Sequence, residues 1–286
     1  MSPAGPRGVF VVGAGRLGRT LALALARGAG GFRLAGTWNR GEARARQTRR
    51  LLRGLTHGPC SGGELPPGIR KADLVLLCAG DDALGSLARR LAERGRIGPG
   101  QTVAHCAGAL DLSVLEPCAR EGAAVGSLHP LRAFVDPAED LARLPGTLAV
   151  LEGEAEALPL LEALAGALSL RTATLAGGPR ARARYHAAAV NAAGNLCALM
   201  DASLELAAGA GLSRDDALSG LLALSRGVLE AIEREGDPAR ALTGPVARGD
   251  EAVLAAHREA LRGLPADLRK VYELLIARSR RLAGRR

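Results

Sequence analysis

Three glycines near the start of the chain are spaced as in a dinucleotide-binding turn. Gly13, Gly15 and Gly18 spell G-x-G-x-x-G between the apolar stretch Val9–Val12 and an alanine- and leucine-rich helical pattern. In such a turn the first glycine makes the tight bend, the second lets the backbone approach a pyrophosphate, and the third lets the helix pack on the strand. The free N–H groups of the helix then face the phosphates. The predicted contacts are Gly13, Ala14, Gly15, Arg16, Leu17 and Gly18.

The end of the second predicted strand indicates which dinucleotide binds. This strand is expected at Phe32–Trp38, and Asn39 and Arg40 follow it. NAD-selective sites usually place an acidic residue there to hold the ribose 2′-hydroxyl, but the nearest carboxylate is that of Glu42, in the next helical turn. A guanidinium suits a 2′-phosphate. The sequence therefore favours NADP(H) over NAD(H), with Asn39 and Arg40 beside the ribose.

Further candidate residues stand at the carboxyl ends of later strands, where ligands of open α/β sheets bind. They are Asp81, Asp82, His105, Ser127 and His129. His129 precedes Pro130, which stiffens its turn, and a histidine of near-neutral pKa can protonate the oxygen formed when hydride reaches a carbonyl. The alternative is a histidine that only caps the turn by a hydrogen bond.

The second half of the chain offers Tyr185–His186 and two asparagines, Asn191 and Asn195. The asparagines are four residues apart and are expected on one helix face. Amides in an alanine- and leucine-rich helix are costly to bury unless they bond a partner or a ligand. They are candidate contacts for substrate or nicotinamide, and a pair of interhelical hydrogen bonds is the alternative.

A glycine- and proline-containing loop at 242–250 carries Thr243, Arg248 and Asp250. The arginine fork would match a substrate carboxylate. An ordinary surface turn would have similar residues.

These residues require a framework, and short strands alternating with helices predict one. After the first two, strands are expected at 73–78, 102–106, 124–128, 148–151 and 171–175. They indicate a doubly wound parallel sheet, a Rossmann domain of residues 1–176. After Gly177 the apolar periodicity becomes helical, with one long helix expected from about Arg182 to Ala208. Residues 177–286 are thus expected to form an all-helical domain, with substrate held between the two domains.

Composition excludes several other classes of protein. The 286 residues are 48% hydrophobic and 23% charged, as in globular proteins. The net charge is +9, but the arginines are scattered and aromatics make up 2%, so we expect no nucleic-acid partner. No apolar run is long enough to span a bilayer, and the five cysteines show no metal-ligand spacing. We expect a cytoplasmic protein with free thiols, no membrane association and no metal.

Four segments carry a resemblance to known proteins: Gly13–Gly18, Ser127–Leu131, Tyr185–Ala189 and Leu242–Asp250. On these segments the chain resembles members of the 6-phosphogluconate-dehydrogenase-like superfamily. More closely it resembles bacterial Rossmann-like proteins whose C-terminal half was long catalogued as a domain of unknown function. The resemblance implies a Rossmann domain followed by a helical domain, NADP-dependent oxidoreductase activity, in some cases ketopantoate reduction, and a homodimer formed through the helical domains.

The chain is also similar to ketopantoate reductases, which carry Lys-x-x-x-Asn-x-x-x-Asn with the lysine as catalytic acid. Asn191 and Asn195 match this motif, but Ala187 occupies the lysine position. The resemblance then implies that His186, Tyr185 or His129 replaces the lysine, that the chemistry differs, or that the protein does not catalyse. The Ser127–Pro130 segment is similar to one in prephenate dehydrogenases, which work in the oxidative direction.

The resulting hypothesis is an NADPH-dependent reductase of a small keto acid similar to 2-dehydropantoate. The alternatives are an imine reductase of the pyrroline-carboxylate kind, a prephenate-type dehydrogenase, and a non-catalytic NADP-binding regulator. The predicted catalytic residues are His129, His186, Asn191 and Asn195. The predicted substrate contacts are Ser127, Thr243, Arg248 and Asp250. The predicted cofactor contacts beyond the glycine turn are Asn39, Arg40 and Ala79.

Overall fold

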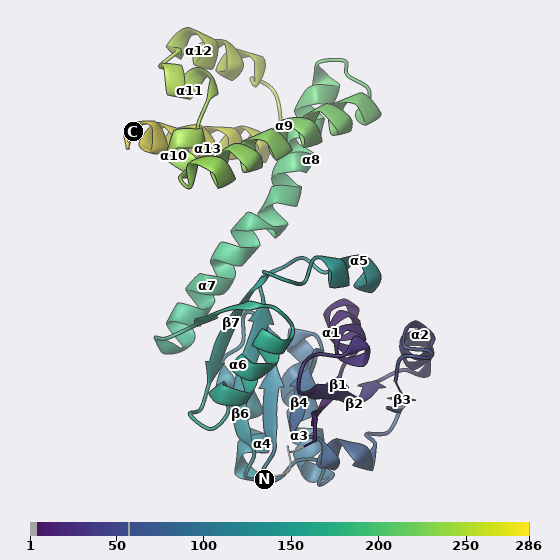
Figure 1. Cartoon of the computed structure of the whole chain (residues 1–286). Helices are drawn as coiled ribbons and strands as arrows, with labels where there is room; N and C mark the ends of the chain where they lie inside the picture. Colours follow the sequence, from purple (N-terminus) through teal and green to yellow (C-terminus); the bar gives the residue numbers. More distant parts are fainter. Residues whose placement is uncertain (1–4, 57, 286) are drawn as a thin grey trace. The chain divides into compact units, whose positions relative to one another are not determined.

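The computed structural model of the chain describes residues 5–56 and 58–285. The chain divides into two compact units, Met1–Asn191 and Ala192–Arg286. The first unit contains the sheet, and the second is helical (Figure 1).

The sheet of the first unit has eight strands in the order β3-β2-β1-β4-β5-β6-β7-β8. They are β1 (Arg7–Val12), β2 (Phe32–Asn39), β3 (Cys60–Gly62), β4 (Leu74–Leu77), β5 (Thr102–His105), β6 (Ala124–Pro130), β7 (Leu148–Gly153) and β8 (Arg171–Thr174). The Rossmann-type fold is confirmed. The predicted parallel pairing holds for every strand pair except β6–β7, which is antiparallel. The connection from β6 to β7 contains only the short helix α5 (Pro137–Ala142), which packs on α1 (Arg16–Arg27). The chain therefore re-enters the sheet at the same end at which β6 finished, and β7 runs back beside it.

The side chains of β1 alternate between two apolar cores, one on each face of the sheet. Val9 and Val11 pack with α1 and with α6 (Leu158–Ala167). Phe10 and Val12 pack with α3 (Asp81–Glu93) and α4 (Glu116–Arg120) on the opposite face. These two layers bury the strands. The carboxyl ends of β1, β4, β5 and β6 lie side by side at one end of the sheet (Figure 1).

Two further helices belong to the first unit. Helix α2 (Glu42–Leu51) follows β2, and α7 (Gly178–Ala192) follows β8. Short 3-10 turns occur at Pro67–Lys71 and Leu112–Leu115. The domain division expected at 176/177 lies just after the last strand, whereas the compact units divide after Asn191. Helix α7 therefore goes with the sheet.

The second unit contains helices α8 to α13. They are α8 (Gly194–Gly209), α9 (Arg214–Glu235), α10 (Pro238–Ala241), α11 (Gly244–Arg248), α12 (Glu251–Ala260) and α13 (Ala266–Ala283). The expectation of one continuous helix from Arg182 to Ala208 is wrong. Ala193 has φ −119°, far from the helical value, and it precedes Gly194, a poor helix former. Among the described helices, none is long and apolar enough to cross a membrane.

Candidate functional site

The three glycines of the first turn have the separate geometries that dinucleotide binding requires. Gly13 has φ +90°, and a Cβ there would lie 2.7 Å from the backbone N of Ala79. A Cβ on Gly18 would lie 2.7 Å from the carbonyl oxygen of Gly13. Among the described residues, a Cβ on Gly15 would meet only that same oxygen, at 4.0 Å. Gly13 and Gly18 are therefore required by packing, while Gly15 leaves room for a ligand.

Helix α1 begins directly at this turn. Its N-cap is Gly15, which has no side chain to bond the N–H groups of the first turn, and that turn carries no acidic residue. The exposed amides and the positive end of the helix dipole thus form a site suited to phosphate.

A cleft of about 490 Å³ opens beside the glycine turn. It is lined by Gly13, Gly15, Trp38, Asn39, Arg40, Gly41, Ala43, Arg44, Cys78, Ala79, Gly80, Asp82, Ala83, Ser86, Leu87 and Arg90. Five of the predicted cofactor residues, Gly13, Gly15, Asn39, Arg40 and Ala79, therefore meet at one cleft. The described lining residues include three arginines and one carboxylate, so the cleft favours an anion.

The nearest acidic residue after β2 is turned away from this cleft. A Cβ on Gly62, in the edge strand β3, would lie 2.7 Å from Oε1 of Glu42. Glu42 packs against that strand and does not line the cleft in the described structure. Asn39 is 4% exposed, and its Oδ1 lies 3.4 Å from Oγ1 of Thr48. The position that holds a ribose 2′-hydroxyl in NAD sites therefore lacks its usual carboxylate.

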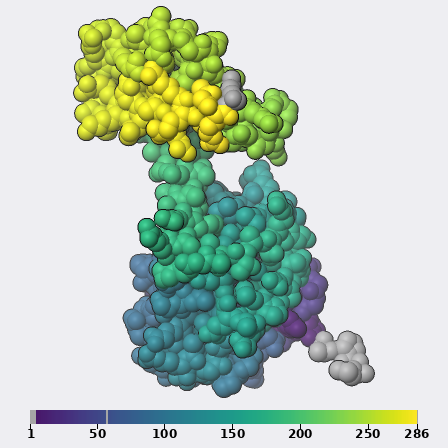
Figure 2. Space-filling view, turned by 90° about the vertical axis from the view of Figure 1, so that its left-hand side faces the viewer, coloured from purple at the N-terminus to yellow at the C-terminus, as the bar shows by residue number. Residues whose placement is uncertain are grey.

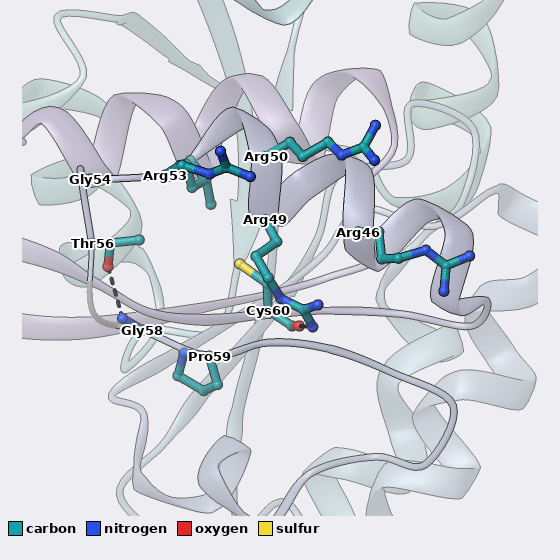
Figure 3. A pocket seen from close by; sticks show the side chains of 10 residues that line it. Arg46, Arg49, Arg50, Arg53, Gly54, Thr56, Gly58, Pro59 and Cys60 are labelled. Atoms are coloured by element: carbon teal, nitrogen blue, oxygen red, sulfur yellow. Dashed lines mark hydrogen bonds between the residues drawn. The ribbon is translucent and has the colours of Figure 1, made fainter.

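A second pocket, of about 580 Å³, lies beside α2. Its lining includes Arg46, Arg49, Arg50 and Arg53. Figure 3 shows these four guanidinium groups spread apart, with that of Arg49 turned toward Cys60, whose carbonyl oxygen it bonds at 2.6 Å. The arginines do not converge on one point, so the geometry does not favour this pocket as the site of chemistry.

At the end of β6, His129 meets α7. Its Nδ1 lies 2.5 Å from the hydroxyl oxygen of Tyr185, and the two rings meet edge to face with centroids 5.6 Å apart. A Cβ on Gly108 would lie 3.0 Å from Nε2 of His129 and 2.8 Å from Cδ2 of His186. The structure therefore brings together the predicted residues His129 and His186, with Gly108 leaving the space between them.

The expectation that His129 has a near-neutral pKa is wrong. Burial, and then the positive charge of Arg182 and the neighbouring His186, lower the pKa of His129 to about 4. Burial also raises the pKa of the Tyr185 phenol. At neutral pH both groups are uncharged, and in the tautomer in which the Tyr185 hydroxyl donates to Nδ1, the proton of the imidazole is on Nε2. In that tautomer the donor face of His129 is the one beside Gly108.

Arg182, one helical turn before Tyr185, is completely buried. Its Nη2 donates to Oγ of Ser127 at 2.5 Å, and its Nε donates to the carbonyl oxygen of Leu110 at 2.6 Å. Oε2 of Glu152 lies 3.4 Å from Nε. Ser127 is also buried, so in place of the predicted substrate contact the structure shows a hydroxyl that bonds Arg182 inside the protein.

His105, the candidate on β5, is likewise inside the protein. Its side chain is fully buried, and its Nδ1 accepts a hydrogen bond from the backbone N of Ala107 at 3.2 Å. Burial, followed by the charge of Arg182, lowers the pKa of His105 to about 4. This histidine supports the loop after β5 as a neutral group.

The remaining predicted residues lie at or beyond the end of the first unit. Asn191 is its last residue, and Asn195, Thr243, Arg248 and Asp250 belong to the second unit. Asp250 caps α12 through a hydrogen bond from the backbone N of Val253 to its Oδ1, at 3.2 Å. Catalytic and substrate-binding roles for these five residues stay predictions.

Sequence reasoning passed over Arg182 and left Tyr185 as one of three alternatives. The available signal was their spacing. Arg182, Tyr185 and His186 are related by three and four residues, which places them on one helix face.

Comparison with known proteins identifies two domains. Residues 5–130 match the model of a Rossmann-like domain, and residues 147–279 match the domain of unknown function DUF2520. The chain thus carries a Rossmann-like domain followed by a DUF2520 domain. The DUF2520 region begins at β7, so it contains two strands of the sheet as well as α7. No curated protein matches the sequence.

Solved structures share the fold over nearly the whole chain. A Bacteroides fragilis protein provisionally named an NADP oxidoreductase is 24% identical, covering 96% of this chain and 98% of its own, with a TM-score of 0.70. Protein TM1727 from Thermotoga maritima is 22% identical over 97% and 100%, with a TM-score of 0.72. A reductive aminase from Aspergillus terreus, in complex with NADPH and ethyl levulinate, is 19% identical over 98% of each chain, with a TM-score of 0.62.

Proposed function

We propose that this Rossmann-like DUF2520 protein is an NADP(H)-dependent oxidoreductase that reduces the carbonyl group of a small keto acid. The observation that carries this proposal is a basic cleft at the glycine turn, at the same carboxyl end of the sheet as the His129–Tyr185 pair. Three strand spacings separate the end of β1, which leads into the glycine turn, from the end of β6, about 14 Å. That span suits a cofactor whose pyrophosphate and nicotinamide lie far apart.

The cleft fits NADP(H) better than NAD(H). The pyrophosphate would lie at Gly15 and the first turn of α1, where a side chain is missing. Arg40 and Arg44 would bind the 2′-phosphate, and Glu42 is turned away. The names of two structural neighbours, which include NADP and NADPH, support this choice. When bound, the reduced nicotinamide supplies the hydride.

The protein's own residues would supply the proton. Nε2–H of His129 would donate to the developing alkoxide while Nδ1 takes the proton of Tyr185, so the imidazole stays neutral throughout. This relay avoids the imidazolium, which burial disfavours. His186 lies beside the same face and would help to orient the substrate oxygen. The arginine fork of Arg248 would bind a substrate carboxylate.

Two measurements test the proposal. Calorimetry with NADPH and NADH should show uptake of NADPH, with much weaker uptake of NADH. NADPH oxidation should then be followed against a panel of 2-keto acids, beginning with 2-dehydropantoate. No uptake of either coenzyme would overturn the cofactor assignment, and uptake without turnover on any acid would overturn the keto-acid reductase.

Imine reduction is the second candidate. It is supported by the whole-length similarity to a reductive aminase and by the His129–Tyr185 pair, because an imine nitrogen, like a carbonyl oxygen, needs a proton donor during reduction. Cyclic imines and amine–ketone mixtures belong in the same assay panel. A non-catalytic NADP-binding regulator is the third, supported by Ala187 in the lysine position of ketopantoate reductases. Binding of NADPH that is unchanged in His129→Ala, without turnover, would favour it.

We also propose a homodimer formed through the helical domain, residues 177–286, with residues 1–176 as the cofactor domain. The second unit exposes large apolar side chains: Leu224 is 67%, Leu229 56% and Leu274 70% exposed. Helix α13, which carries Leu274, forms part of the surface in Figure 2 (yellow). Covering such side chains is favourable. Light scattering on the purified chain should give twice the chain mass, and a monomer at micromolar concentration would refute the dimer.

A further inference from the structure

We infer that Arg182 is a positioning residue for proton transfer, which holds Tyr185 against His129 and stabilises the phenolate that Tyr185 becomes when it gives up its proton. The inference rests on the proposed function, because it concerns the same proton relay. It assigns the source of the proton to Tyr185. Arg182 would act through Tyr185 and His129 and would not itself touch the substrate.

The contacts of Arg182 connect α7 to three parts of the sheet edge. Nη2 bonds Ser127 on β6, Nε bonds the carbonyl of Leu110 in the loop after β5, and Glu152 on β7 lies within ion-pair distance. Nη2 is also 3.5 Å from the carbonyl oxygen of Ala107. Ser127 and Glu152 are register partners across β6 and β7. The guanidinium thus fixes one turn of α7 over the strand that carries His129.

Helical geometry carries this constraint to the reacting groups. Tyr185 and His186 follow Arg182 by three and four residues, so all three project from one face of α7. Tyr185 reaches Nδ1 of His129 and His186 reaches the space beside Gly108. A shift of the helix by about 1 Å would take this 2.5 Å contact beyond hydrogen-bond distance.

The charge of Arg182 acts on both partners of the relay in the same direction. The guanidinium disfavours a proton on His129, lowering its pKa, and it opposes the rise in the pKa of Tyr185 that burial causes. The other groups facing His129 are His186 and Tyr185 on α7 and His105 on β5, and Glu152 on β7 partly balances Arg182. Among the described residues Nη1 of Arg182 has no hydrogen-bond partner. The charges of Glu152 and Asp111 also act on Arg182. A buried guanidinium stabilises an anion that forms near it, because the electrostatic interaction is screened less inside the protein than in water.

The relay is balanced in protons and electrons. The O–H bond of Tyr185 breaks and an N–H bond forms at Nδ1 of His129. The Nε2–H bond breaks and an O–H bond forms on the substrate oxygen, whose carbon receives the hydride of the reduced nicotinamide. Before the next turnover Nε2 takes a proton from water and Nδ1 returns its proton to the phenolate, which is held near Arg182 until then.

The test separates charge from packing. In a Tyr272→Phe background Tyr185 is the only tyrosine, so its ionisation can be followed by phenolate absorbance without coenzyme or substrate. Arg182→Met should raise the pKa of Tyr185 and, by NMR, that of His129, whereas Arg182→Lys should keep both close to wild type. Arg182→Met combined with Glu152→Gln avoids leaving Glu152 unpaired and serves if the single variant does not fold.

Activity gives the second readout. In Arg182→Met kcat should fall at least about tenfold with the NADPH affinity unchanged, because the loss is confined to the transition state. Unchanged titration of Tyr185 in a folded Arg182→Met or double variant would overturn the inference, even if the protein reduces keto acids. A shifted titration in a protein that turns over no substrate would uphold the role of Arg182 while refuting the proposed reaction.

Discussion

The hydroxyl of Tyr185 lies 2.5 Å from Nδ1 of His129, across fifty-six residues of chain. His129 closes the Rossmann-like region and Tyr185 lies in the DUF2520 region, so the pair joins the two matched regions of the chain. Neither side chain alone has a pKa near neutrality, because burial lowers the pKa of His129 and raises that of Tyr185. The pair therefore works as a unit or not at all.

Tyr185→Phe should lower kcat by about a hundredfold or more, because it removes the proton source while keeping the ring. The NADPH dissociation constant should not change. Tyr272→Phe is the matched control, because Tyr272 makes a similar bond of 2.7 Å to His257 in the second unit. Steady-state kinetics on the best substrate of the panel makes the comparison. Equal activity in the two variants would rule out Tyr185 as the proton source.

The glycine turn predicts two different outcomes for two alanines. Gly15→Ala should leave the unfolding free energy nearly unchanged and abolish NADPH binding, because its Cβ would enter the space left for the pyrophosphate. Gly18→Ala should destabilise the first unit by about 1–3 kcal/mol, because its Cβ would lie 2.7 Å from the carbonyl oxygen of Gly13. Calorimetry and denaturant titration separate them. Tight NADPH binding by Gly15→Ala would contradict the assigned site.

Arg40→Gln should weaken NADPH binding about ten- to hundredfold, because a charge-assisted bond to a phosphate is lost. NADH binding should change little. Arg50→Gln is the control: Arg50 is an exposed arginine on the neighbouring helix that does not line the described cleft. A loss of equal size for the two coenzymes would mean that Arg40 does not recognise the 2′-phosphate.

Stability should fall with acidity because of the buried histidines. The pKa of His105 is about 4 in the folded protein and 6.5 as an ordinary value, so the unfolded chain binds more protons between these limits. The contribution of neutral His105 to the free energy of unfolding is therefore fully present above pH 6.5. About 3 kcal/mol of it is lost as the pH falls toward 4. His129 acts with the same sign.

Denaturant unfolding followed by Trp38, the single tryptophan and a buried residue of the first unit, measures this effect. His105→Asn should flatten the dependence between pH 6.5 and 4. His257→Asn, an exposed site in the second unit, should not. A wild-type slope in His105→Asn would show that other groups cause the acid sensitivity.

The sequence by itself determined the features whose causes are local. The glycine spacing at 13–18 predicted the turn and the start of α1, since backbone freedom and helix initiation depend on adjacent residues. The absence of a carboxylate directly after β2 predicted the basic character of the cleft. Apolar runs located seven of the eight strands in the described structure, all but the short edge strand β3, together with the helical second half.

Only the tertiary structure decided what depends on distant contacts. The antiparallel β6–β7 pair follows from where α5 packs, and the helix break at Ala193 from a backbone angle that apolar periodicity does not encode. The chemistry of the site was decided in the same way: Arg182 and Tyr185 reach β6 only when α7 packs on the sheet. A histidine's pKa is set by burial and by charges from other elements, and those exist only in the folded chain.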